Sequence, residues 1–335
     1  MTLTGAPIQQ LEEPEDLTGP VHVGSNFEIV RAMLRDRTAL LGLVLVSTLV
    51  LVSLFAGTLA RHDPNAIDVA NRFARLSRGH PMGTDYLGRD VFSRVLHGGR
   101  LSIGSAIVAA FVTAALGLVI GLVAGYFGGI VDTIFSRIID VILGFPILLL
   151  ALAITGILGI GLRNIIISLV IASWAWYARI VRGAVLAEKN KSYVEAARTI
   201  GASNVRILFR HILPNIVAPV IVWTTIDTGQ LLLAISSLSF LGLGVKPPAS
   251  EWGAMLSDGR SYLDHGLQMM VFPGAAIFLT VLGLNLLGDG LRDALDPRTR
   301  RGRHAVGTAG DGTVTPRGVL KLTTRQAIPP VKAAP

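Results

Sequence analysis

The chain contains no cysteine. A disulfide, a thiolate-bound metal and an iron–sulfur cluster are therefore excluded, although this absence fits any cellular compartment. Histidines number only 7 and are scattered without an HExxH pair, so we predict no metal site. The phosphate-binding pattern GxxxxGK[ST] and a Ser/His/Asp spacing typical of hydrolases are also missing. We therefore predict that this chain is not an enzyme and carries no catalytic residues and no cofactor of its own.

Charged residues are scarce, at 16% of the chain, whereas hydrophobic residues make up 51% and the mean hydropathy is +0.59. A helix needs about 20 apolar residues to cross the ~30 Å of hydrocarbon in a bilayer. Six apolar runs meet this requirement: 39–60, 101–126, 138–160, 164–186, 216–244 and 269–291. The runs are continuous rather than alternating, which excludes a transmembrane barrel. The sequence thus predicts an all-α integral membrane protein with six transmembrane helices.

Lysine and arginine are absent from the first 30 residues, so this segment lacks the basic region of a signal peptide. The first apolar run is too long for a cleavable signal and is predicted to remain as an anchor. We predict four parts: a disordered tail at 1–30, an anchor with an outer loop at 31–100, a helical bundle at 101–297 and a disordered tail at 298–335.

The basic residues are distributed unevenly between the predicted loops. If both termini lie inside, the inner side carries two thirds of the 30 Lys and Arg residues. The positive-inside rule therefore predicts cytoplasmic N and C termini. This topology accounts for the basic tails, so we expect the lipid membrane, and no nucleic acid, as a partner.

Residues 191–214 form a basic, helix-prone insert between two apolar runs. Ser192 and Glu195 have the spacing of a capping box, and Gly201 stands where a helix favours a left-handed residue. A second short helix is expected to follow, which Pro214 ends or kinks. Because a helix of two turns is not stable alone in water, it must rest on another element. We interpret the insert as a docking element for a soluble partner; the alternative is a basic connector that lies on anionic headgroups.

The same insert, within a loop predicted at 188–215, resembles the EAA loop of permease subunits of ABC importers. The match consists of these residues: Glu195, Ala196, Ala197, Gly201, Leu213 and Pro214. His211 departs from it, because that family has an aliphatic residue three positions before the proline. In the family the loop forms a coupling helix that fits a groove on the ATP-hydrolysing subunit. The resemblance implies that Glu195, Ala196, Ala197, Gly201 and Pro214 couple this chain to an ATPase.

Two further segments, 83–102 and 239–253, are similar to signatures of the dipeptide/oligopeptide/nickel group of these importers, in its second-permease (C-type) subunit. The resemblance spans roughly 31–297. It implies a type I importer permease of six transmembrane helices in the plasma or inner membrane. It also implies a heterodimer with a homologous permease, cytoplasmic subunits that use ATP and Mg, and an extracytoplasmic substrate-binding protein. Relatives in this group carry dipeptides, oligopeptides, nickel or other small cargoes, including haem.

Asp227 lies near the middle of the fifth apolar run. An ionised carboxylate is costly in hydrocarbon, so it must face the bundle interior or water. One hypothesis is that Asp227 lines the translocation path with Thr224, Thr228 and Gln230. The other is that it is a protonated or hydrogen-bonded carboxyl that joins two helices. A secondary transporter driven by an ion gradient is the alternative function, and it would favour paired intramembrane ionisable residues and inverted repeats.

Three smaller patterns predict local contacts. Glycines recur at every fourth position over 117–125, which favours close helix packing within the subunit, with a subunit interface as the alternative. If Leu87–Leu96 is helical, Asp90 and Arg94 form an i,i+4 ion pair. This pair is expected to act either as a structural clamp in the outer loop or as a docking site for the binding protein. Trp252 is predicted to lie at the headgroup level.

Overall fold

The computed structural model describes residues 33–34 and 36–295. The predicted tails at 1–30 and 298–335 lie outside the described residues. In the described part the structure is helical, and the only β-type pairing there is an isolated bridge between Thr84 and Asp90. The elements in chain order are α2 (Arg37–Leu54), α3 (Ala56–Leu59), η1 (Val69–Asn71), α4 (Val91–Phe127), α5 (Gly129–Leu143), α6 (Ile147–Leu158), α7 (Leu162–Glu188), α8 (Ser192–Thr199), α9 (Asn204–Ile207), η2 (Leu208–Ile212), α10 (Leu213–Leu238), η3 (Ser239–Leu243), α11 (Trp252–Gly259), η4 (Arg260–Tyr262) and α12 (Gln268–Leu295).

Five helical runs are long and apolar enough to cross a membrane: α2, α4, α7, the continuous run from Asn204 to Leu243, and α12. They coincide with five of the six predicted apolar runs. The second begins earlier than predicted, at Val91, because Asp90 caps it and accepts a hydrogen bond from the backbone N–H of Ser93 at 2.7 Å. The predicted all-α membrane fold is confirmed.

The third predicted run, 138–160, is wrong as one straight helix. The chain forms α5 and α6 instead, and the two helices meet at 90°. Pro146 lacks an N–H and disfavours the helical conformation at Phe145, so the helix ends before it. Together α5 and α6 form either a sixth, broken span or a re-entrant loop.

The glycine stripe packs α4 against α7, as predicted for contacts within the subunit. A Cβ on Gly117 would lie 2.2 Å from Cβ of Tyr177, and one on Gly121 would lie 2.7 Å from Cβ of Val181. Any larger side chain would push the two helices apart, so glycine sets their distance.

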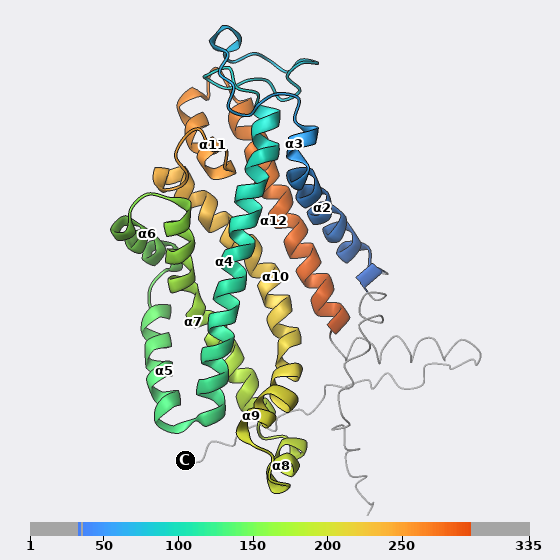
Figure 1. The fold of residues 1–335 in the computed structure, drawn as a ribbon, viewed down its shortest axis with the longest axis vertical. Coiled ribbons are helices and arrows are strands. Elements are labelled where there is room, and N and C mark those ends of the chain that lie inside the picture. The colour runs from blue at the N-terminus through green and yellow to red at the C-terminus, as the bar shows by residue number, and fades with distance from the viewer. Residues whose placement is uncertain (1–32, 35, 296–335) are drawn as a thin grey trace, which may run out of the picture. The chain divides into compact units, whose positions relative to one another are not determined.

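Short helices and loops lie at the two opposite ends of the bundle. Helices α8 and α9 lie at one end, which we call the α8 end, while the long connection between α3 and α4 lies with α11 at the opposite one, which we call the loop end (Figure 1). Helices α4, α7 and α10 run between these two ends.

Candidate functional site

The start of α8 differs from the prediction. Ser192 is the first helical residue, Lys191 is the N-cap, and no side chain caps the helix. The predicted capping box of Ser192 and Glu195 is therefore wrong. The end of α7 fixes this turn instead: the N–H of Lys191 donates to the carbonyl of Glu188 at 3.2 Å, and its ammonium pairs with the Glu188 carboxylate at 2.8 Å.

The end of α8 follows the prediction. Gly201 has a φ of +80°, in the left-handed region that favours glycine. Its N–H donates to the carbonyl of Arg198 at 2.9 Å, and the N–H of Ala202 donates to the carbonyl of Ala197 at 3.0 Å. These two bonds form a Schellman motif, which ends α8 and turns the chain sharply toward α9.

The two alanines of the EAA segment differ in burial. Ala197 is buried and packs with Val194 in an apolar cluster formed by α4, α7 and α10. Ala196 and Glu195 are exposed. The inner face of α8 therefore supplies the support that a short helix requires, and the outer face is open to a partner.

Three apolar side chains are exposed along the segment from the end of α8 to η2. Ile200 is 84% exposed, and Val205 and Phe209 are each 64% exposed. Sequence reasoning missed them, because single apolar residues in a basic segment carry no periodic signal. Exposed apolar side chains that gather beside a polar helix are typical of a protein interface.

Pro214 neither ends nor breaks the helical run. It lies in the first turn of α10, directly after the π-helical turn η2, and the helix continues to Leu243. In the π turn the backbone hydrogen bonds span five residues instead of four. This change lies directly before Pro214, which has no N–H to donate.

Two tyrosines hold α8 and the adjoining α9, together called the α8 region, against the bundle. Tyr193 donates its hydroxyl to the Glu188 carboxylate and accepts a hydrogen bond from the Asn215 amide at 2.9 Å. Burial raises the pKa of the Tyr193 hydroxyl, and the Glu188 carboxylate raises it further. The hydroxyl therefore stays protonated and can donate a hydrogen bond. Tyr126 on α4 donates to the Asn204 side chain at 2.7 Å. The α8 region is therefore bonded to α4, α7 and α10.

Replacing Tyr193 by phenylalanine is expected to loosen α8 from the bundle. The ring keeps its packing, but the hydrogen bonds of its hydroxyl with Glu188 and Asn215, of about 1 kcal/mol each, are lost. The backbone amides of α8 are therefore expected to exchange with deuterium several-fold faster. Tyr262→Phe at the loop end, where the ring stacks on Tyr86, is the matched control. An unchanged exchange rate in the Tyr193 variant would show that this bridge does not hold α8 in place.

The loop end contains a buried charge network in place of the predicted surface pair. Asp90 caps α4 and does not pair with Arg94. Arg89 pairs with Asp85 at 2.6 Å and approaches Asp258 of α11 at 3.7 Å, while Arg94 lies 3.7 Å from Asp85. Burial raises the pKa of Asp258, and the two guanidinium groups oppose this. The network ties the α3–α4 connection to α11.

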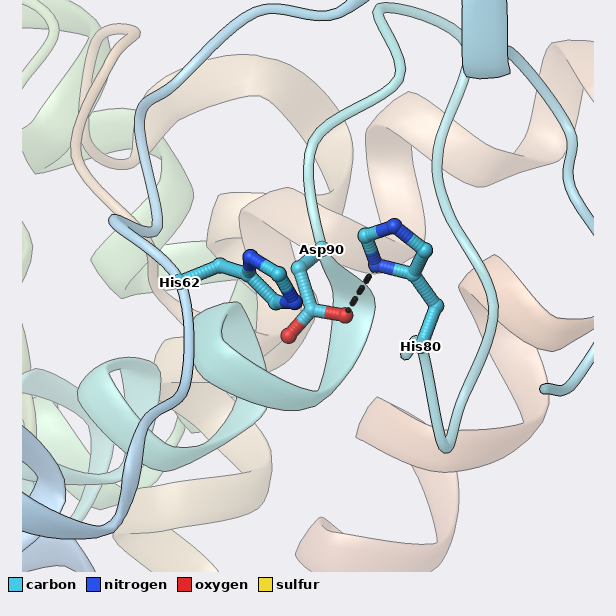
Figure 2. Close-up of side chains that lie close together, drawn as sticks. All are labelled: His62, His80 and Asp90. Carbon is cyan, nitrogen blue, oxygen red and sulfur yellow. Dashed lines mark hydrogen bonds and ion pairs between the residues drawn. The ribbon is translucent and has the colours of Figure 1, made fainter. Parts of the chain in front are cut away.

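Two histidines that are distant in sequence meet beside this network (Figure 2). Possible ligand atoms of His62, His80 and Asp90 lie within 4.8 Å of one another. Nδ1 of His80 bonds Oδ1 of Asp90 at 2.9 Å, and Ser93 donates its N–H and hydroxyl to Oδ2 at 2.7 Å each. Both carboxylate oxygens therefore already have hydrogen-bond partners, and the cluster closes the loop onto the start of α4.

Trp252 was predicted to lie at the headgroup level, but its side chain is buried within the protein, at 1% exposed, and so does not contact headgroups. Its indole N–H donates to the carbonyl of Val95 at 2.9 Å, and its backbone N–H donates to the Ser102 hydroxyl at 3.0 Å. Glu251 caps α11 and also accepts from Ser102. These partners lie about 150 residues away in the sequence and could not be read from the local pattern.

Asp227 is bonded to a neighbouring helix. The hydroxyl of Tyr177 on α7 donates to Oδ2 of Asp227 on α10 at 3.0 Å. This is the contact that the second hypothesis requires, namely a carboxyl that joins two helices. Gln230 is exposed on the same helix. The role of Asp227 and Gln230 in the translocation path stays a prediction.

Comparison with known proteins identifies the class. Residues 117–301 match the family described as binding-protein-dependent transport system inner membrane component, and residues 27–77 match the N-terminal TM domain of oligopeptide transport permease C. Similar curated proteins include the glutathione transport system permease protein GsiD of Escherichia coli O6:K15:H31 and that of Shigella boydii serotype 4. Each is 44% identical over 291 residues, which is 87% of this chain and 94% of the relative.

A solved structure of the MetNI methionine ABC transporter in an inward-facing conformation shows the same fold. It has a TM-score of 0.50 and 21% identity, and the match covers 61% of this chain and 97% of that one. The chain belongs to the binding-protein-dependent transport system inner membrane components, the permease subunits of ABC importers, and to their oligopeptide permease C type. It is a non-catalytic subunit of such an importer, in the inner membrane, and the family works with an ATPase and a substrate-binding protein. The alternative of a secondary transporter is thereby set aside.

Proposed function

We propose that this chain forms half of the translocation path for small peptides, paired with a homologous second permease in a heterodimer. The curated relatives are glutathione permeases, and glutathione is a tripeptide, which supports a cargo of di- and tripeptide size. The α8 end faces the cytoplasm and both termini lie on that side, an orientation that the distribution of Lys and Arg supports. The ATPase partner binds ATP and Mg.

The observation that carries the proposal is the open face of α8. Its buried side rests on the bundle and its exposed side presents Glu195 and Ala196, while Gly201 sets the angle at which the helix ends. A helix fixed on one side and open on the other suits a groove on a soluble partner. Closure of the ATPase on nucleotide then shifts the permease between its two conformations, to the extent that the partner binds one conformation more tightly.

Because the chain has no cysteine, a single engineered cysteine tests the contact directly. Ala196→Cys in the complete transporter is expected to cross-link to an ATP-hydrolysing subunit, and to react with a membrane-impermeant thiol reagent only in inverted vesicles. Leu41→Cys, exposed on α2, is the matched control and should give no such cross-link. Labelling of position 196 from the cell exterior would overturn both the orientation and the coupling role.

A further inference from the structure

A polar cavity of about 350 Å³ lies between α5 and α7, lined by Ser136, Ile139, Asp140, Arg179 and Arg182. It is separate from the α8 face and from Asp227, and two ion pairs cross it. One joins Arg179 to Asp140. The other joins Arg182 to Asp132, with Nη2 donating to Oδ2 at 2.7 Å.

These charged groups are open to their surroundings rather than sealed in the subunit. The side chains of Arg179 and Asp140 are 48% and 54% exposed, and those of Arg182 and Asp132 are 31% and 20% exposed. On the same face of α7, a Cβ on Gly183 would meet nothing within 4 Å. The cavity therefore borders free space beside this subunit.

The place of the charges within the helices decides what can fill that space. Asp140 lies about 16 Å along α5 from its start, and Arg179 about 13 Å along α7 from its end, at 1.5 Å per residue. Helix α7 is long and apolar enough to cross a membrane, and α5 passes the same test together with α6. Exposed charges inside such helices are costly against lipid, so they favour a water-filled cavity or another protein surface.

The opposite face of α5 supports this assignment. Ile130, Ile134 and Val141 are 80%, 53% and 65% exposed, and they form an apolar side suited to lipid. Asp132, Ser136 and Asp140 follow one another at four-residue spacing and share the other side, toward α7. Helix α5 thus has an apolar side that suits hydrocarbon and, toward α7, a polar side that suits water.

We propose that this cavity lines the cargo route and that its two opposite charges receive the two ends of a zwitterionic peptide. The Arg179 guanidinium presents paired donors that suit an α-carboxylate, and Asp140 accepts from an α-ammonium group. In the absence of cargo the two side chains pair with each other. A peptide therefore exchanges one ion pair for two, and its charges do not meet hydrocarbon. This inference rests on the proposed function, because it assumes that the cargo is a peptide.

Thiol labelling tests the water-filled route without any assumption about cargo. Ser136→Cys in the complete transporter is expected to react with a positively charged methanethiosulfonate reagent, and Val141→Cys on the apolar side is expected not to react. A Ser136→Cys that is inert in every nucleotide state, or that cross-links to the second permease, would overturn the proposal in favour of a permanent subunit interface.

Uptake then tests recognition of the peptide ends. Arg179→Gln is expected to lower uptake of a free tripeptide by at least about tenfold, the effect of losing one hydrogen bond to a charged group, and uptake of its C-terminally amidated form much less. The double variant Arg179→Asp, Asp140→Arg keeps the ion pair, so a merely structural pair predicts full rescue of uptake. Full rescue, or equal losses for both peptides, would refute the recognition. If the unaltered complex takes up no peptide, the proposed cargo fails, and the labelling result still decides the route.

Discussion

Replacing Gly201 by valine is expected to lower ATP-driven uptake strongly while the chain still reaches the membrane. The residue has a φ of +80°, which a β-branched side chain adopts only at a cost of about 1–2 kcal/mol or more. A Cβ at this position would meet nothing within 4 Å, so the substitution acts on the backbone and not through a clash. Without the sharp turn α8 lengthens or changes its direction, and its open face no longer fits the partner. Uptake should fall at least about tenfold, while the ATPase loses its response to cargo.

Two variants serve as controls for this prediction. Gly201→Asn should keep most of the transport, because asparagine tolerates the left-handed conformation. Gly156→Val adds the same side chain to α6, where space is free and φ is not positive, and should have little effect. Normal uptake by Gly201→Val would show that the angle of α8 is not part of the coupling.

The largest loss of stability is expected for Trp252→Ala. This side chain is 1% exposed, and its ring fits against two glycines of α4, Gly98 and Gly99, where an added Cβ would lie 3.0 Å from the indole. Its removal leaves a large cavity, loses the indole hydrogen bond to Val95, and costs about 3–5 kcal/mol. Thermal unfolding of the purified transporter in detergent measures the effect.

The control for this substitution is a tryptophan of the same size in a different environment. Trp223 on α10 is 43% exposed, so Trp223→Ala should lower the unfolding temperature far less. Equal losses for the two variants would contradict the assignment of Trp252 as the anchor between α11 and α4.

Five membrane-spanning helices and the all-α class could be predicted because hydrocarbon imposes a simple requirement on each span separately. The break between α5 and α6 also has a local cause at Pro146, but a run of apolar residues hides it. The position of Trp252 could not be predicted, since its environment comes from Val95 and Ser102, far away in the chain. The pattern around a single tryptophan is the same whether it lies in headgroups or in a protein core.

The candidate site shows the same division between local and distant causes. Gly201 could be identified from sequence because the end of a helix is a local event. Tyr193 and its bridge to Asn215 depend on how α8 folds back between α7 and α10. The ion pairs between α5 and α7 join residues 39 and 50 positions apart. Charges in an apolar run can be noticed in a sequence, but their partners require the packed bundle.

The helical run from Asn204 to Leu243 begins beside α8 and ends next to α11. At 1.5 Å per residue its 40 residues extend about 60 Å, more than the thickness of the bilayer. One helical run therefore connects the proposed ATPase contact to the loop end, with π-helical turns at η2 and η3 and a non-helical residue at Gly242. Under the proposed coupling, a displacement of α8 reaches the loop end through this run, so the two ends of the bundle move together.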